Sequence, residues 1–307
     1  MSSAIAGAGS IGVAFAVTFA IGGREVSLWD PDPARLAAVP AEVATRLAAL
    51  SRHGLLDEPA EQVADRIRTH TDLAQAVAGA ELVQECAPER AELKQELFAQ
   101  LLAAAPAQAI IASSSSAIPI SQVTAGLSGR ERCLVAHPGN PPYLLPVIEL
   151  VGAEFTDVQS VQRAAGFYRS VGMNPVVVHK EVEGFVFNRL QGALLREAYC
   201  LVRDGVISVE DLDTVVRDGP GRRWAFIGPF ETVDLNTRGG IASHAQKMGP
   251  AYRRMGNERG QDDPWTDELV ASVAQQRAEL LDPADWEDRV LWRDEQLMRL
   301  AKLRRDN

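Results

Sequence analysis

The chain has 307 residues, of which 46% are hydrophobic and 23% are charged, a balance typical of soluble globular proteins. Its net charge of −10 argues against nucleic acid or an anionic membrane as a general partner, because both are themselves negatively charged. No apolar run approaches the length of a membrane span, and MSSAIAGAGSIG lacks a basic leader and a cleavage-like site, so we expect neither an anchor nor a signal peptide.

The cysteines Cys86, Cys133 and Cys200 are far apart and not in metal-ligand spacing. We therefore expect a reduced, cytoplasmic protein without a metal site.

Short apolar segments alternate with Ala- and Leu-rich helical segments from the start of the chain. The predicted strands are 2–6, 25–30, 67–70, 81–85, 109–113, 132–137, 146–151 and 174–178. Predicted helices between them include 10–22, 32–50, 89–104 and 157–171. This alternation predicts an α/β fold with a Rossmann-type, doubly wound parallel sheet. The connection between 132–137 and 146–151 is too short for a crossover helix, so these two strands should form an antiparallel hairpin.

The strand pattern stops after about residue 182. Residues 185–205 are helical in pattern and end on a glycine, and a second helix should follow from Ser208, which has Asp211 three residues on. Residues 284–305 also have an amphipathic helical pattern. We therefore predict an α/β domain over 1–182 and an all-helical domain over 183–307.

A glycine-rich motif links the first strand to the first helix. Gly7, Ala8, Gly9, Ser10, Ile11 and Gly12 form a GxGxxG sequence, in which glycines allow a tight turn and close approach of a pyrophosphate to the helix N-terminus. The second strand ends on Asp30, an acid that can accept hydrogen bonds from both ribose hydroxyls of NAD and would repel a 2′-phosphate. The alternative is a glycine-rich turn with Asp30 as a helix cap. We predict NAD binding, although Arg35 is near enough to permit some use of NADP.

A histidine and a glutamate interrupt the predicted hairpin, 135-VAHPGNPPYLLPVIELV-151. If the hairpin brings His137 beside Glu149, the carboxylate can accept the Nδ1 proton and leave Nε2 as a base. A dehydrogenase acting on an alcohol needs such a base to take the hydroxyl proton. The residues alone leave open a core histidine bonded to a backbone carbonyl, with the glutamate on the surface.

Two further polar sites lie where ligands bind in this fold class. The serines 113–116 end an apolar strand, at the sheet edge where doubly wound folds bind ligands. One of them could contact a substrate oxygen or the nicotinamide ribose, or could cap the segment that begins at Pro119. Asn188, in the first turn of the helix after Gly184, could present its amide to a substrate carbonyl or could be a helix cap.

Six segments in this order resemble the L-3-hydroxyacyl-CoA dehydrogenase superfamily, and in particular its branch that contains λ-crystallin, an L-gulonate 3-dehydrogenase. The segments are GAGSIG, LVQECAPERAELKQELFAQL, AHPGNPPYLLPVIELV, EVEGFVFNRLQGALLREA, GPGRRWAFIGPFETVDLN and WRDEQLMRLAKLRR. The resemblance covers nearly the whole chain. One departure is the glycine before Asn140, where relatives carry a bulkier residue, which affects the packing of that loop.

The resemblance implies a role for each matching residue. The catalytic set would be His137 as base, Glu149 as its partner carboxylate, Ser116 and Asn188. The NAD-binding set would be Gly7 to Gly12, Asp30, Glu89, Lys94, Ser116 and Asn140. The substrate set would be Ser116, His137, Asn188 and Arg223. In this reading Arg223 binds a substrate carboxylate; the alternative is a surface arginine.

The segment 31–57 bears on the substrate. It contains no lysine, whereas a CoA ester needs basic groups for its phosphates. The lack of lysine favours a small free hydroxy acid over a CoA ester. The resemblance implies NAD-linked oxidation of the 3-hydroxyl of an acid such as L-gulonate, with a CoA-ester dehydrogenase of the same fold as the alternative. A nucleotide-binding protein without catalysis is a third possibility, against which the His, Glu, Ser and Asn set argues. The resemblance also implies a homodimer formed through the helical domain.

Overall fold

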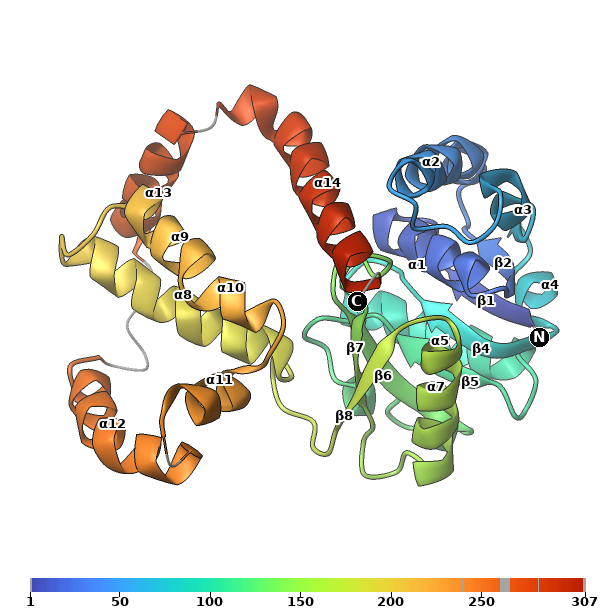
Figure 1. Cartoon of the computed structure of the whole chain (residues 1–307). Helices are drawn as coiled ribbons and strands as arrows, with labels where there is room; N and C mark the ends of the chain where they lie inside the picture. The colour runs from blue at the N-terminus through green and yellow to red at the C-terminus, as the bar shows by residue number, and fades with distance from the viewer. Residues whose placement is uncertain (1, 239, 260–265, 281, 306–307) are drawn as a thin grey trace. The chain divides into compact units, whose positions relative to one another are not determined.

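A computed structural model describes residues 2–238, 240–259, 266–280 and 282–305 (Figure 1). Contacts divide the chain into two compact units, Met1–Arg189 with Leu291–Asn307, and Leu190–Val290. The boundary predicted after residue 182 lies shortly before this division. The prediction also assigned 291–307 to the helical domain, whereas the contacts group these residues with the α/β unit. Apolar packing is the physical reason for this grouping: Met298 belongs to the core of the α/β unit, and Leu297 packs against that core.

The first unit is built on an eight-stranded sheet in the order β3-β2-β1-β4-β5-β6-β7-β8. The strands are β1 (Ser2–Ala6), β2 (Glu25–Trp29), β3 (Ile67–His70), β4 (Ala80–Glu85), β5 (Ile110–Ser113), β6 (Cys133–Pro138), β7 (Val147–Val151) and β8 (Asn174–Val178). Neighbouring strands are parallel except β6 and β7, which are antiparallel. The predicted strands, the doubly wound sheet and the hairpin are confirmed.

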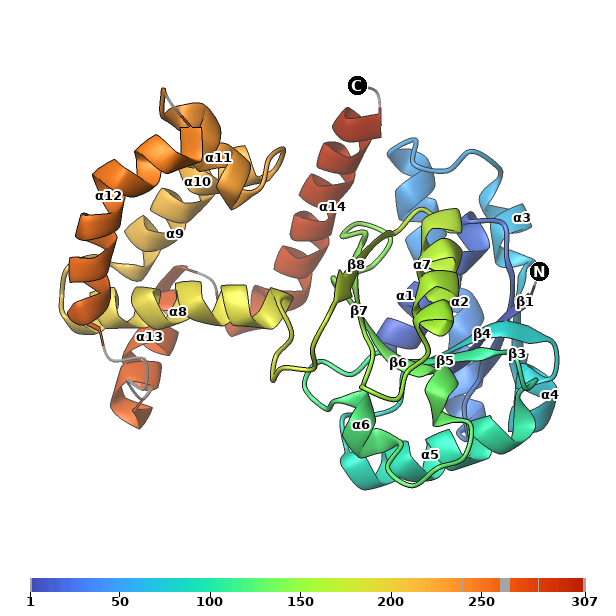
Figure 2. The same ribbon diagram turned by 90° about the horizontal axis from the view of Figure 1, so that it is seen from below.

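Helices cover both faces of this sheet (Figures 1 and 2). They are α1 (Ser10–Ile21), α2 (Pro33–Arg52), α3 (Ala60–Ala64), α4 (Leu73–Val77), α5 (Ala91–Ala104), α6 (Ile120–Val123) and α7 (Val158–Ser170), with a 3-10 turn at Arg130–Arg132. One apolar core joins the sheet to α1, α2 and α7, and a second joins it to α4, α5 and α6. The two cores take alternate residues of the central strands: in β4, Leu82 belongs to the first core and Val83 to the second. Strands buried on both faces are largely apolar, which is why the sequence identified them.

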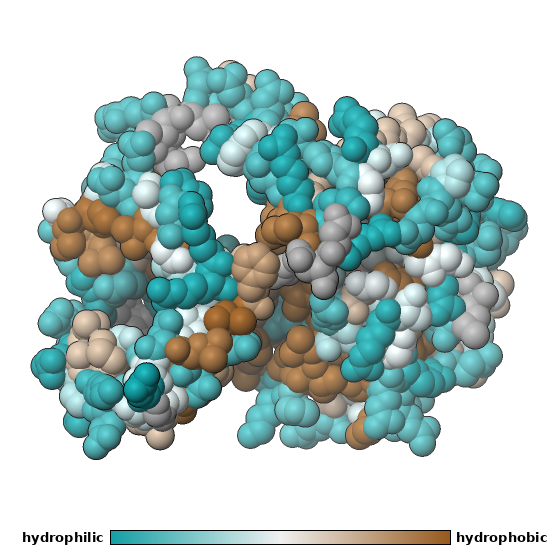
Figure 3. Space-filling model, viewed as in Figure 1, coloured by the Kyte–Doolittle hydropathy of each residue, from teal (hydrophilic) through white to brown (hydrophobic). Residues whose placement is uncertain are grey.

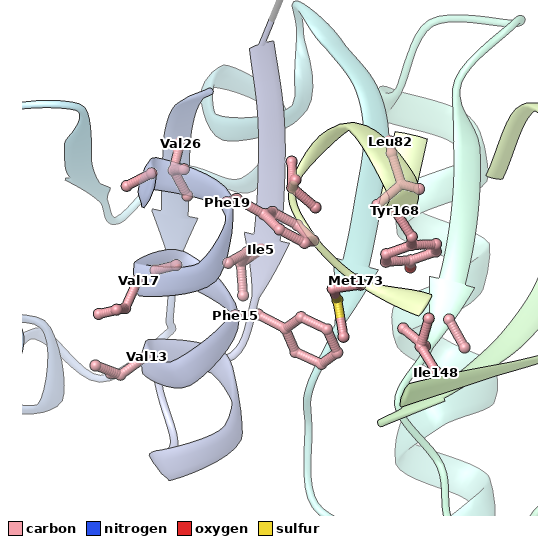
Figure 4. Close-up of a cluster of buried hydrophobic side chains, with 14 of the residues drawn as sticks. Ile5, Val13, Phe15, Val17, Phe19, Val26, Leu82, Ile148, Tyr168 and Met173 are labelled. Atoms are coloured by element: carbon pink, nitrogen blue, oxygen red, sulfur yellow. The ribbon is translucent and has the colours of Figure 1, made fainter. Parts of the chain in front are cut away.

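Aromatic side chains fill the first core between α1 and α7 (Figure 4). The ring of Phe19 lies 5.0 Å from that of Phe167 in an edge-on arrangement and 6.2 Å from that of Tyr168. The buried Tyr168 hydroxyl donates to Oε1 of Gln84 at 2.5 Å, so both polar groups are satisfied inside the core.

The remaining elements are helical. They are α8 (Phe187–Arg203), α9 (Val209–Asp218), α10 (Pro220–Trp224), α11 (Pro229–Asn236), α12 (Gly240–Asn257), α13 (Asp267–Leu280), a 3-10 turn at Pro283–Asp285 and α14 (Trp286–Arg305). Gly205 has a φ of +67° after α8, and Oγ of Ser208 accepts a hydrogen bond from the amide of Asp211 at 3.1 Å, so the predicted helix stop and helix cap are both found. In the part of the chain that the structure describes, no helix combines the length and the apolar character needed to cross a membrane.

Candidate active site

The glycine-rich loop has the tight geometry that its sequence predicts. Gly7 has a φ of +114°, and a Cβ placed there would lie 2.8 Å from the backbone of Cys86. A Cβ on Gly12 would lie 1.9 Å from the carbonyl oxygen of Gly7, so neither position accepts a side chain. Gly9 is different: a Cβ there would meet nothing within 4 Å. The loop is therefore packed on its inner side and open at Gly9, the residue before α1, which suits a phosphate at the helix N-terminus.

Asp30 stands beside this loop and is not a helix cap. Its Oδ2 accepts a hydrogen bond from the amide of Ala8 at 2.7 Å, whereas α2 is capped by Asp32, whose Oδ1 accepts from the amide of Ala34 at 2.9 Å. Asp30 lines a cavity of about 660 Å³ together with Gly9. Because that cavity joins the glycine loop to an acid at the end of β2, its residues fit the adenosine half of a dinucleotide.

Arg35 lines the same cavity but is already engaged. Its Nε donates to the carbonyl of Ala8 at 2.6 Å, and its two terminal nitrogens bind the two carboxylate oxygens of Glu42. Because the carboxylate of Glu42 compensates the charge of this guanidinium, Arg35 would attract a 2′-phosphate only weakly. The structure therefore weakens the argument that Arg35 would permit NADP.

The β6–β7 hairpin pairs His137 directly with Glu149. Nδ1 of His137 lies 2.8 Å from Oε2 of Glu149, and the two residues are 6% and 3% exposed. Oε1 of Glu149 accepts from the amides of Val186 at 2.8 Å and Phe187 at 3.0 Å. The alternative of a surface glutamate is excluded. Nδ1 of the imidazole is occupied, so Nε2 is the nitrogen left for chemistry.

The pKa of Glu149 lies below its ordinary value of 4.5. Burial alone would raise it, but the hydrogen bond with His137 and the two backbone amides of Phe187 and Val186 outweigh that effect. The carboxylate therefore stays ionised at neutral pH and can accept the Nδ1 proton.

The serine loop after β5 meets the start of α8. Nδ2 of Asn188 donates to the carbonyl of Ser116 at 3.1 Å, so Asn188 is bonded to this loop rather than to its own helix. Ser115 is the serine that closes the turn, because its Oγ accepts from the amide of Ile118 at 2.7 Å. Ser116 is exposed and so remains available to a ligand.

These contacts join the predicted catalytic residues into one set. Ser116 is bonded to Asn188, the next residue after Phe187, whose amide is bonded to Glu149, and Glu149 is bonded to His137. Residues separated by up to 72 positions thereby share one end of the sheet. The arrangement brings an imidazole, its ionised carboxylate partner, a hydroxyl and an amide together in the fold.

Asn140 is exposed in the loop after β6, and the glycine before it has a packing reason. A Cβ on Gly139 would lie 2.8 Å from the Cβ of Leu145 and 2.9 Å from its carbonyl oxygen. Leu145 therefore takes the space that a larger residue at position 139 would need.

Glu89 and Lys94, both predicted to contact NAD, differ in solvent exposure. Glu89 is partly exposed, but the Lys94 side chain is fully buried, and its Nζ donates to Glu85 at 2.8 Å and to the carbonyl of Ala87 at 3.2 Å. A direct contact between Lys94 and NAD stays a prediction. Sequence reasoning did not single out Glu85, although a glutamine and a glutamate ending a buried strand, LVQE, were a signal that polar groups are bonded there.

Arg223 lies on α10 in the second unit and is exposed. Its role toward a substrate carboxylate stays a prediction.

Comparison with known proteins decides the family. The description "3-hydroxyacyl-CoA dehydrogenase, NAD binding domain" matches residues 2–182, and "3-hydroxyacyl-CoA dehydrogenase, C-terminal domain" matches residues 184–280. The chain belongs to the 3-hydroxyacyl-CoA dehydrogenase family. It is therefore an NAD-dependent dehydrogenase with a Rossmann-type domain and a helical C-terminal domain.

Relatives within the family cover most of the chain. Lambda-crystallin of Oryctolagus cuniculus is 39% identical over 305 residues, 98% of this chain and 95% of the relative. L-carnitine dehydrogenase of Pseudomonas aeruginosa is 40% identical over 261 residues, 85% of this chain and 78% of the relative. Among solved structures, an NAD-dependent 5-formyl-3-hydroxy-2-methylpyridine 4-carboxylic acid 5-dehydrogenase has a TM-score of 0.84 at 29% identity, covering 98% of this chain and 97% of its own.

Proposed function

We propose that this dehydrogenase oxidises the 3-hydroxyl of a small free hydroxy acid, such as L-gulonate, to the 3-keto acid. The hydrogen-bonded pair of His137 and Glu149 is the observation that carries the proposal, because oxidation of an alcohol needs a base at the hydroxyl. In the proposed step Nε2 of His137 takes the proton of the 3-hydroxyl while the hydride leaves C3, the carbon that bears this hydroxyl. The carboxylate of Glu149 stabilises the imidazolium that results. In the reverse direction the imidazolium returns the proton to the alkoxide.

NAD, when bound, supplies the acceptor of the hydride. We assign its adenosine half to the cavity beside Asp30 and its pyrophosphate to the glycine loop, with Glu89 and Asn140 on the nicotinamide side. Ser116 and Asn188 would bind the reacting oxygen, since a hydroxyl and an amide can both donate to a developing carbonyl or alkoxide. Arg223 would bind the substrate carboxylate through its two guanidinium nitrogens.

The contacts that the arginines of segment 31–57 make within the protein support a free acid over a CoA ester as the substrate. Arg35 is paired with Glu42. Arg46 donates to the carbonyl of Ser10 at 3.1 Å and lies 3.9 Å from Glu42. Two of the three arginines in this segment are therefore committed to the protein itself, which leaves little basic surface for the phosphates of CoA. Relatives named for L-carnitine, itself a free 3-hydroxy acid, agree with this direction.

A CoA ester is the second candidate, because a solved structure 31% identical to this chain is a 3-hydroxybutyryl-CoA dehydrogenase. The test is NAD reduction by the purified protein over L-gulonate, L-carnitine and L-3-hydroxybutyryl-CoA. A higher kcat/KM on a free acid supports the proposal, and a higher kcat/KM on the CoA ester replaces it with the second candidate. Tight NADH binding without turnover on any of these compounds would favour a non-catalytic role.

We further propose a homodimer and, because Cys86, Cys133 and Cys200 are all free thiols, a reducing, cytoplasmic setting. The support for the homodimer is the number of large apolar side chains exposed on the helical unit, which include Phe226, Phe230 and Leu235 at 65%, 78% and 68% exposure. Figure 3 shows hydrophobic residues at the surface of the molecule in this view. Exposed apolar area on this scale favours association. Light scattering after size-exclusion chromatography would test it, and a monomer at micromolar concentration would overturn it.

A further inference from the structure

A fully buried carboxylate lies at the end of β4, outside the catalytic set described above. Glu85 is 0% exposed. Its Oε1 accepts from the amide of Ala87 at 2.6 Å and from Nζ of Lys94 at 2.8 Å. Its Oε2 accepts from Oγ of Ser113 at 2.6 Å and from the same Nζ at 3.0 Å. Both oxygens are therefore fully bonded to the protein, and no face of the group is open to a ligand.

The partner of this carboxylate is as deeply buried. Lys94 is also 0% exposed, and removing both charges from water costs free energy that their attraction only partly returns. Well-packed apolar residues would give comparable stability at such a site. An ion pair in this position therefore needs another explanation, which its remaining contacts supply.

The second acid near Lys94 holds the serine loop. Oε2 of Glu89 lies 3.5 Å from Nζ of Lys94. Oε1 of Glu89 accepts from Oγ of Ser115 at 2.5 Å, from the amide of Ser116 at 3.0 Å and from the amide of Ala117 at 3.2 Å. One carboxylate oxygen thus fixes three donors of the loop that carries Ser116.

A shorter route joins Glu85 to the same loop. Oγ of Ser113 donates to Glu85 and accepts from the amide of Ser115 at 3.2 Å. Glu85 is therefore connected to the loop both through Ser113 and through Lys94 and Glu89.

We propose that Glu85 is a positioning residue, which neutralises Lys94 and so leaves Oε1 of Glu89 to hold the backbone of Ser116. Without the negative charge of Glu85, the buried ammonium of Lys94 has Glu89 as its nearest remaining carboxylate. The attraction draws Glu89 inward from 3.5 Å and away from the two loop amides, because a buried charge requires a close partner. Ser116 then loses its fixed position. The consequence for turnover rests on the proposed role of Ser116, whereas the consequence for the loop does not.

Glu85→Gln is the test, with Tyr168→Phe as its control. Tyr168→Phe also removes a buried hydrogen bond, the one to Gln84, which is the residue before Glu85. The Tyr168 hydroxyl is bonded to Gln84 and not to any residue of the loop 114–117. In Glu85→Gln we expect hydrogen exchange of the amides of Ser116 and Ala117 to accelerate about tenfold or more. We expect kcat of the folded enzyme to fall about 10- to 100-fold, since small displacements of reacting groups have effects of that size. Tyr168→Phe should leave both quantities unchanged.

The double variant Glu85→Gln, Lys94→Met separates positioning from stability. It removes the pull on Glu89, so exchange of the two loop amides should move back toward the wild type. If Glu85 were merely structural, Glu85→Gln would change the melting temperature while kcat of the folded enzyme stayed constant. Wild-type exchange at the two loop amides in folded Glu85→Gln overturns the inference.

Two outcomes remain to be assigned. If Glu85→Gln does not fold, Glu85→Asp takes its place, because its shorter carboxylate stands farther from Nζ of Lys94; its loop amides must exchange faster than those of the wild type or the inference fails. Faster exchange with unchanged kcat supports the positioning of the loop and overturns the proposed role of Ser116 instead.

Discussion

Substitution of Glu149 by glutamine separates the two tasks of this carboxylate. The wild-type group accepts from Nδ1 of His137 and from the amides of Val186 and Phe187. In Glu149→Gln, the carbonyl oxygen can still accept from both amides, which turns the NH2 group toward Nδ1. Two donors cannot share one hydrogen bond, so the imidazole must present Nδ1 as an acceptor and carry its proton on Nε2. That tautomer cannot take a proton from the substrate.

The expected losses differ in size. Turnover should fall about 10²–10⁴-fold, the usual contribution of a positioned base, which corresponds to a barrier higher by about 3–5 kcal/mol. The free energy of unfolding should fall by only about 1 kcal/mol, because a charge-assisted hydrogen bond is exchanged for a neutral one. Steady-state NADH absorbance and thermal unfolding measure the two quantities on the same sample.

Glu149→Ala is the matched control. It also removes the acceptor for the amides of Val186 and Phe187, and leaving these donors unsatisfied costs about 1–3 kcal/mol each. It should therefore be clearly less stable than Glu149→Gln while losing a similar factor in kcat. If Glu149→Gln keeps kcat within about fivefold of the wild type, far less than a lost base would cause, then the contact with Glu149 does not set the tautomer of His137.

The pH dependence of stability gives a second check. The pKa of Glu149 is lower in the folded protein than its ordinary value of 4.5. Its contribution to stability is therefore present above about pH 4.5 and is lost as the pH falls through the lowered folded pKa. The difference in melting temperature between the wild type and Glu149→Gln should shrink on acidification; a constant difference would contradict the assigned charge state.

Three other substitutions test separate parts of the site. His137→Gln should lower kcat by about 10²–10⁴-fold while NADH affinity measured by fluorescence changes little; near-normal turnover would remove His137 from the mechanism. Asp30→Ala should weaken NAD binding and relax discrimination against NADP in paired kcat/KM measurements, because the carboxylate that repels a 2′-phosphate is lost; unchanged kinetics with both cofactors would refute the assignment. Gly12→Ala should abolish tight NADH binding, since the new Cβ would lie 1.9 Å from the carbonyl oxygen of Gly7 and the loop must deform; wild-type affinity would show that the loop geometry is not required.

The order of elements was readable from the sequence because each signal was local. A parallel strand buried on both faces is apolar over most of its length, and each predicted strand begins and ends within one residue of its position in the structure. The short helices α3 and α4 were not predicted, and α6 was considered only as a capped segment that begins at Pro119. They have five, five and four residues, too few to establish a helical period.

The candidate site was predicted unevenly for the same physical reason. Glycines and an acid at fixed spacing indicate a nucleotide-binding loop without any tertiary information. The positions of His137 and Glu149 in the sequence did not establish that the two residues form a hydrogen-bonded pair, because they also allowed a core histidine with a surface glutamate. The antiparallel register of β6 and β7 places the two residues opposite each other and so decides between these alternatives.

The sequence by itself determined the class of fold, the nucleotide loop and the family, since these depend on local patterns and on short motifs in order. Tertiary structure decided which polar groups are bonded to one another. It buried Lys94 against Glu85, paired Arg35 with Glu42, and grouped α14 from Leu291 onward with the α/β unit. Each of these contacts joins side chains whose identity is fixed locally but whose partner depends on how the chain packs, which no local pattern contains.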